Sequence, residues 1–123
     1  MRFALAAHAI PTDADAQAVY RNLASVRQFI GKLSPVPIVV TMAFFEGFIQ
    51  RFMPYLAELA RRQGSAEMEY TDVHGVCDIT HTQELFRALD AEMALANGSV
   101  ATDDVFEGVV LLRSLIRNIV VND

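Results

Sequence analysis

The order of apolar and polar positions along the chain predicts helices from one end to the other. Apolar residues recur every three or four positions between residues 14 and 30, the period of a helix with one buried face; the stripe consists of Val19, Leu23, Val26 and Ile30. Asp13 is placed to cap this helix and Gly31 to end it. No stretch shows the alternation that is typical of a half-buried strand.

The second predicted helix is the most apolar part of the chain. Ser34 followed by Pro35 is typical of an N-cap with proline at the first helical position. The helix that they open is predicted to run to about Arg62. Between Val36 and Phe48 it is apolar almost all round, which indicates an element buried on every side.

Two further helices complete the pattern. One begins between residues 67 and 72 and ends near Gly98, and the last runs from about Thr102 towards Val120. Helices joined by short loops predict an all-α fold, a helical bundle of about four helices. Because the chain has 123 residues, the size of one small domain, we expect residues 1–123 to form a single unit.

Composition adds an expectation of association. The chain is 53% hydrophobic with a mean hydropathy of +0.28, and a small domain buries a limited share of its surface. We therefore expect another chain to cover part of it. A net charge of −5 argues against a surface that follows nucleic-acid phosphates. The longest uninterrupted apolar runs, PIVVTMAFF and GVVLL, are too short to span a bilayer, so we expect no membrane partner.

The chain contains a single cysteine, Cys77. It therefore forms no intrachain disulfide and no thiolate zinc site, which fits a reducing cytoplasm as the location. Small apolar surroundings are the usual environment of a free cysteine, and we expect Cys77 in the core.

The candidate chemistry lies in the stretch YTDVHGVCDITHTQELFRAL, which holds His74, Asp78 and His81 in the spacing H-x3-D-x2-H. On a helix these positions fall within an arc of about 60°. The same stripe continues through apolar Leu85, so we expect all three side chains to face the interior. A buried carboxylate between two imidazoles needs a partner, and a divalent cation supplies one. The alternative is a polar stripe on a wet surface.

The spacing also bears on the number of metal ions. His74 and His81 lie roughly 10 Å apart along a straight helix. One ion does not easily bind both unless the helix distorts, whereas two ions with Asp78 between them could.

Glu46, in the stretch TMAFFEGFIQ, is the second clue. It is the only acidic residue between Ala16 and Glu58, and its helical neighbours are apolar. One interpretation is a carboxylate that is hydrogen-bonded to a nearby polar group. The other is a metal ligand delivered from the neighbouring helix, with Gly47 permitting close approach of the two helices.

The combination of AFFEG with H-x3-D-x2-H about thirty residues later resembles the haem-oxygenase-like di-iron oxidases and oxygenases. The metal ligands that this resemblance implies are Glu46, His74, Asp78 and His81. It implies iron as the cofactor, a di-iron centre if the site is assembled, with manganese or zinc also acceptable. It further implies an oxygen-activating oxidoreductase acting on O2 and a small amino- or fatty-acid-like molecule. The apolar walls of the substrate pocket would be Met42, Phe45, Phe48 and Leu85.

The chain departs from that family in one respect. Relatives carry two more ligands, a Glu and a His, on helices that would precede Met1, and His8 does not replace them. We therefore expect the chain to be half of the family fold, completed by a homodimer or by a partner chain. The alternatives are a non-catalytic helical subunit, a truncated remnant, or a metal-free enzyme on the same scaffold; the intact motif disfavours the last.

Overall fold

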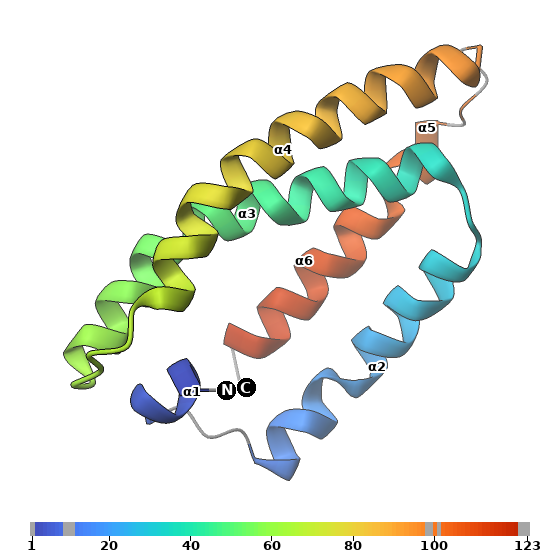
Figure 1. Cartoon of the computed structure of the whole chain (residues 1–123). Helices are drawn as coiled ribbons and strands as arrows, with labels where there is room; N and C mark the ends of the chain where they lie inside the picture. The colour runs from blue at the N-terminus through green and yellow to red at the C-terminus, as the bar shows by residue number, and fades with distance from the viewer. Residues whose placement is uncertain (1, 9–11, 98–99, 101, 121–123) are drawn as a thin grey trace.

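The computed structural model describes residues 2–8, 12–97, 100 and 102–120. All regular elements in these residues are helices (Figure 1), and their bounds are α1 Arg2–Ala6, α2 Asp13–Gly31, α3 Pro35–Arg62, α4 Glu69–Leu95, α5 Thr102–Val105 and α6 Glu107–Val120. The predicted all-α fold is therefore confirmed. The family topology and the expected oligomer stay predictions.

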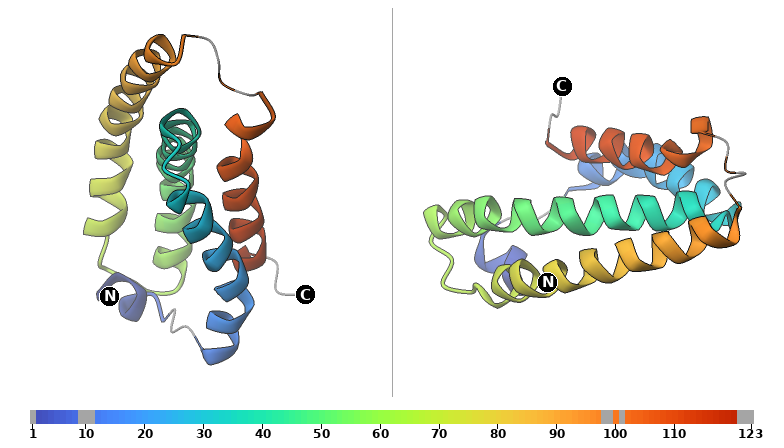
Figure 2. Two further views of the ribbon diagram at one scale, coloured as in Figure 1. Left: turned by 90° about the vertical axis from the view of Figure 1, so that its right-hand side faces the viewer. Right: turned by 90° about the horizontal axis from the view of Figure 1, so that it is seen from above.

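Helix α3 lies in the middle of the structure. Figure 2 shows α4 along one side of it, with α6 and α2 on the other side. This position follows from the sequence, because a helix that is apolar almost all round must be covered on more than one face. Its buried residues are Val36, Pro37, Thr41, Ala43, Met53 and Ala60.

The helix ends agree with the predicted ones to within a few residues. Thr12, not Asp13, is the N-cap of α2: the Thr12 N–H donates to Asp15 Oδ2 at 2.7 Å and the Asp15 N–H donates to Thr12 Oγ1 at 3.3 Å. This reciprocal capping box satisfies two backbone donors, which a cap at Asp13 would leave without partners. The predicted last helix is divided into α5 and α6, on either side of Phe106.

Helices α2 and α6 lie antiparallel and are joined by two polar contacts. Lys32 Nζ lies 2.7 Å from Glu107 at the end of α2 and the start of α6. Asn118 Nδ2 donates to Asn22 Oδ1 at 2.7 Å further along. Exposed polar contacts of this kind stabilise a fold by little, but together they fix the register of the two helices.

Helix α6 approaches α2 and α3 closely at Gly108. A Cβ atom at this position would meet Thr41 Oγ1 and two ring carbons of Phe29, the latter at 2.5 and 2.7 Å. Phe29 and Thr41 are both buried. The three helices therefore pack around a residue that has room for no side chain.

The C-terminal turns of α3 carry an exposed ion-pair cluster. Arg62 Nε lies 2.8 Å and Arg61 Nη1 lies 2.7 Å from the carboxylate of Glu58. The hydrogen bond from Arg62 lowers the pKa of Glu58 below its usual value, and the hydrogen bond from Arg61 makes the next largest contribution.

Helix α3 is also the one helix of the described residues that is long and apolar enough to cross a membrane by length and composition. Short uninterrupted runs suggested otherwise, because Glu46, Gln50 and Arg51 divide the apolar sequence without ending the helix. The core helix of a soluble protein meets the same test. Within the chain 28% of this apolar stretch is buried, so the other helices leave much of it only partly covered.

We predict that Gly108→Ala lowers the free energy of unfolding by about 1–3 kcal/mol, because the added methyl group overpacks the contact with Phe29 and Thr41. Gly31→Ala is the matched control, since nothing lies within 4 Å of a Cβ there, and it should change stability by less than about 1 kcal/mol. Urea unfolding followed by far-ultraviolet circular dichroism measures both. Equal effects of the two substitutions would contradict the close packing at Gly108.

Candidate metal centre

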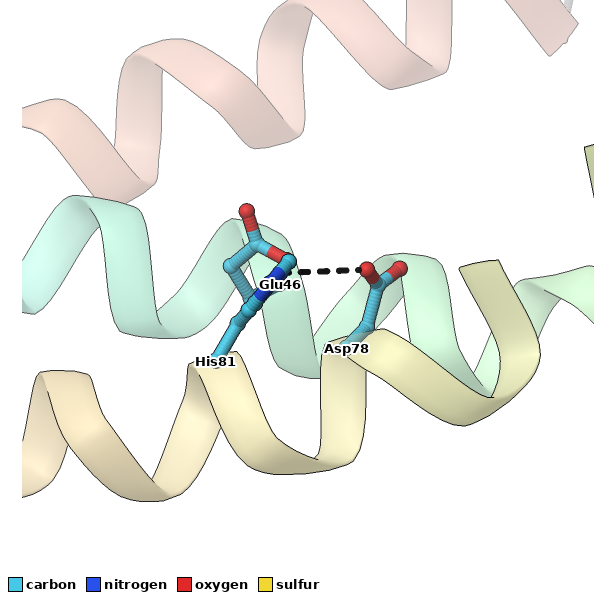
Figure 3. A group of neighbouring side chains, drawn as sticks. All are labelled: Glu46, Asp78 and His81. Atoms are coloured by element: carbon cyan, nitrogen blue, oxygen red, sulfur yellow. Dashed lines mark hydrogen bonds and ion pairs between the residues drawn. The ribbon is translucent and has the colours of Figure 1, made fainter. Parts of the chain in front are cut away.

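The candidate centre forms where α3 and α4 run antiparallel. Glu46 projects from α3 and Asp78 and His81 project from α4, so that their polar ends point toward one another (Figure 3). One ligand atom from each lies within 4.8 Å of the others. His81 Nδ1 is 3.4 Å from Glu46 Oε2 and 3.5 Å from Asp78 Oδ1. Three of the four predicted ligands are therefore brought together from two helices.

Asp78 is the buried residue at the centre of this group. It is 1% exposed, and its Oδ1 atom lies 3.5 Å from the Nδ1 atoms of both His74 and His81. Its Oδ2 atom is buried and has no hydrogen-bond partner in the part of the chain that the structure describes. Contacts of 3.5 Å are longer than the usual 2.7–3.2 Å of an N–H···O hydrogen bond. The carboxylate is therefore removed from water without adequate compensation, which is costly.

His74 reaches the group through Asp78 alone. Its Nδ1 atom is 3.5 Å from Asp78 Oδ1, but it does not belong to the group whose ligand atoms lie within 4.8 Å of one another. Its ring packs on Tyr70 with centroids 4.5 Å apart. The two imidazoles thus flank one carboxylate oxygen, the arrangement expected if Asp78 lies between two ions.

The centre is open on one edge. His81 has 56% of its side chain exposed and Glu46 has 27%. The expectation that the whole motif faces the interior is thus confirmed for Asp78 and wrong for His81, and the side chain of His74, 42% exposed, is only half-buried. The physical reason is that α4 has α3 on one side, so residues about 60° around the helix from Asp78 emerge at the rim of this contact.

Thr82 is a polar residue at the centre that the sequence pattern did not single out. Its Oγ1 atom is buried and has no hydrogen-bond partner among the described residues. The sequence does contain one sign of its place: Thr82 follows Asp78 by four residues, so the two side chains lie on one face of α4. Its Cγ2 atom lies 3.9 Å from a Cβ built on Gly47, an ordinary contact, so an alanine would fit at that glycine.

The side chains present fit a divalent transition metal. Two carboxylates and one or two imidazoles are ligands that iron, manganese and zinc accept. The Oδ1 atom of Asp78 lies beside His81, and the orphaned Oδ2 atom belongs to the same buried carboxylate, so a bound cation would offset the cost of burying this charge. The donors come from elements whose packing is already fixed, which favours a defined site over an adventitious cluster.

The other candidate residues lie apart from this centre. His8 is exposed and adopts a φ of +56° in the turn after α1. Cys77 is exposed, so its expected place in the core is wrong; it lies about 100° around α4 from the buried Asp78 and is therefore outside the contact with α3.

The expected substrate walls are divided between two faces of α3. Met42 and Phe45 lie within one turn of Glu46 and are exposed, and Leu85 is partly buried on α4. Phe48 lies about 120° around the helix from Met42 and lines a groove between α3 and α6 instead. A pocket built from all four side chains stays a prediction.

We predict that Asp78→Asn leaves the metal-free protein as stable as the wild type, or more stable by about 1 kcal/mol, because it removes an uncompensated buried charge at nearly constant shape. The same substitution should abolish the rise in melting temperature that Zn(II) gives the wild type. Asp90→Asn, at an exposed position on the same helix, should preserve that rise. A loss of about 3–5 kcal/mol in the metal-free Asp78→Asn protein would instead identify Asp78 as a structural partner of the histidines.

Comparisons with known proteins leave the centre to be interpreted from its own geometry. No family model, no curated protein and no solved structure matches the chain. The resemblance drawn from the Glu and H-x3-D-x2-H pattern therefore stays a prediction.

Proposed function

We propose that this chain is a non-haem iron-binding, oxygen-activating oxidoreductase of the haem-oxygenase-like di-iron type, acting on a small amino- or fatty-acid-like substrate. One observation carries the proposal: Asp78 is 1% exposed with an unpaired carboxylate oxygen, and it lies beside Glu46 and His81. A purely structural role for that carboxylate would require donors that the described residues do not provide.

Each side chain has a separate task in this proposal. Glu46 and Asp78 supply the negative charge that holds a divalent cation, and His81 supplies a neutral nitrogen ligand. His74 either binds a second cation or orients the Asp78 carboxylate, to which it is 3.5 Å away. Bound iron would supply the activation of oxygen. Met42 and Phe45 lie on the same part of α3 as Glu46. If a second chain packed on them, these apolar side chains would exclude water from the open edge.

The open edge supports a second chain as part of the centre. Exposed apolar side chains occur on both helices that carry the ligands, and they include Met42, Phe45, Val73, Val76 and Ile79. Exposed apolar surface of this extent is typical of a protein interface. A homodimer, or a different partner chain, would cover this surface and bring further ligands to His81.

A second candidate function is a non-catalytic helical subunit or a remnant of such an enzyme. The observation that favours it is the size of the ligand group: within the described residues Glu46, Asp78 and His81 lie together, while His74 lies outside their 4.8 Å limit. Three ligands are enough to hold one ion, whereas the proposed di-iron centre needs ligands for two. Iron binding without oxygen consumption would favour this function over the first.

We predict that the protein binds Fe(II) under anaerobic conditions and then consumes O2. His81→Ala should weaken Fe(II) binding at least about tenfold, because it removes the one nitrogen ligand of the group. The control is His8→Asn, which changes a histidine outside the site and keeps a residue type that tolerates a positive φ. Native mass spectrometry counts the bound iron and an oxygen electrode follows its reaction.

The result that contradicts the iron proposal is also defined. A double variant, His74→Ala with His81→Ala, that binds Fe(II) as tightly as the wild type would exclude this centre as the binding site.

We predict that Fe(II) promotes self-association and that Met42→Lys weakens it at least about tenfold, because a charge replaces apolar surface beside Glu46. Tyr55→Lys is the matched control: Tyr55 is exposed on the same helix and lies about 180° around it from Glu46. Sedimentation equilibrium measures the dimer dissociation constant. A well-folded protein that remains monomeric at high concentration with iron would contradict the homodimer and leave the partner chain.

A further inference from the structure

A groove lies between α3 and α6 and has no role in the proposed function. Its volume is about 690 Å³, within the range of small-molecule sites. Phe44 and Phe48 of α3 form one wall, and Val110 of α6 forms part of the other. Arg113 and Arg117 line the α6 side.

This groove is separate from the candidate metal centre. Phe44 and Phe48 each lie two residues from Glu46, which places them about 160° around α3 from it. Glu46 contacts His81 on the α4 side, whereas the groove faces α6. A molecule in the groove would therefore touch neither Asp78 nor His81.

Two arginines on α6 give the groove a positive charge. Arg113 and Arg117 are four residues apart on one face of α6, where two like charges repel. Both are exposed, and neither has an ion pair or a hydrogen bond from its side chain within the described residues. Arg21, Arg27 and Arg51 are likewise without a side-chain ion pair among the described residues, but they do not line the groove. In a protein of net charge −5, two neighbouring unpaired guanidinium groups indicate a place for an anion.

Apolar walls define the rest of the ligand. Three apolar residues of the groove are partly buried, namely Phe44, Phe48 and Ile116. Val110 is more than half exposed to solvent. An inorganic anion would leave this surface in water, whereas an alkyl chain would cover it. Guanidinium groups bind carboxylates through paired, charge-assisted hydrogen bonds. A ligand that uses both parts of the groove is an amphiphilic carboxylate.

We infer that the groove between α3 and α6 binds a fatty-acid anion, with its carboxylate on Arg113 and Arg117 and its alkyl chain along Phe44, Phe48 and Val110. The geometry requires no metal ion. It adds a binding site for an aliphatic acid on the side of α3 that faces away from Glu46.

Isothermal titration calorimetry with dodecanoate, octanoate and dodecyltrimethylammonium tests this inference on the full chain. Dodecanoate should bind more tightly than octanoate, by roughly three- to fourfold for each methylene that the groove covers. The cationic amphiphile should bind at least about tenfold more weakly than dodecanoate, because the two guanidinium groups repel it.

Two variants with equal change of charge locate the site. Arg113→Gln with Arg117→Gln should weaken dodecanoate binding at least about tenfold. Arg21→Gln with Arg27→Gln, at exposed positions on α2, should leave it unchanged. Val110→Asp, at an exposed position and therefore tolerated by the fold, should weaken binding by charge repulsion. Circular dichroism confirms that each variant is folded.

Three results would overturn the inference. Equal loss in the two arginine pairs would show a general effect of net charge, and equal affinity for the cationic amphiphile would show unspecific apolar adsorption. The third result concerns the double variant Arg113→Gln with Arg117→Gln. If this variant sediments as a different oligomer but binds dodecanoate like the wild type, the groove is an interface between chains. Asp78→Asn should bind dodecanoate like the wild type, so failure of the metal proposal leaves this test unaffected.

Discussion

The need to cover α3 on several sides determines the arrangement of the other helices. Contact with water raises the free energy of an apolar helix of this length. Helix α4 therefore packs along one side of it and α6 along another, with α2 packed against α6. The positions of both candidate sites follow from this placement. The candidate metal centre lies where α3 meets α4, and the groove with two arginines lies where α3 meets α6.

Asp78 is the residue at which stability and function separate. A fully buried carboxylate with an orphaned oxygen lowers the stability of the metal-free chain. The neighbouring side chains are not hydrogen-bonded to it at short distance, so they do not offset that cost. The same geometry gives an incoming cation a negatively charged, partly assembled set of ligands. A local weakness of the fold is therefore the best physical argument for a ligand.

The two faces of α3 differ in charge as well as in position. Glu46 and Asp78 make the α4 side acidic, and Arg113 and Arg117 make the α6 side basic. Neither face is closed by the chain itself, since His81 and Val110 are each more than half exposed. Surfaces that remain apolar beside these polar groups agree with the excess of hydrophobic residues in the composition.

The sequence by itself determined the all-α class, the four long helices and most of their ends, because helical period, caps and glycines act within a few residues of one another. It also identified Glu46, Asp78 and His81, since an acidic residue on an apolar helix and the H-x3-D-x2-H spacing are visible without a fold. The cap at Thr12, the break at Phe106 and the exposure of Cys77 were missed. Only the tertiary structure decided which faces of α4 and α6 meet α3. That choice depends on contacts such as Gly108 against Phe29, which join residues far apart in the chain. It left His81 at an open rim and Asp78 buried, and it opened a groove beside Arg113 and Arg117 that no local pattern contains.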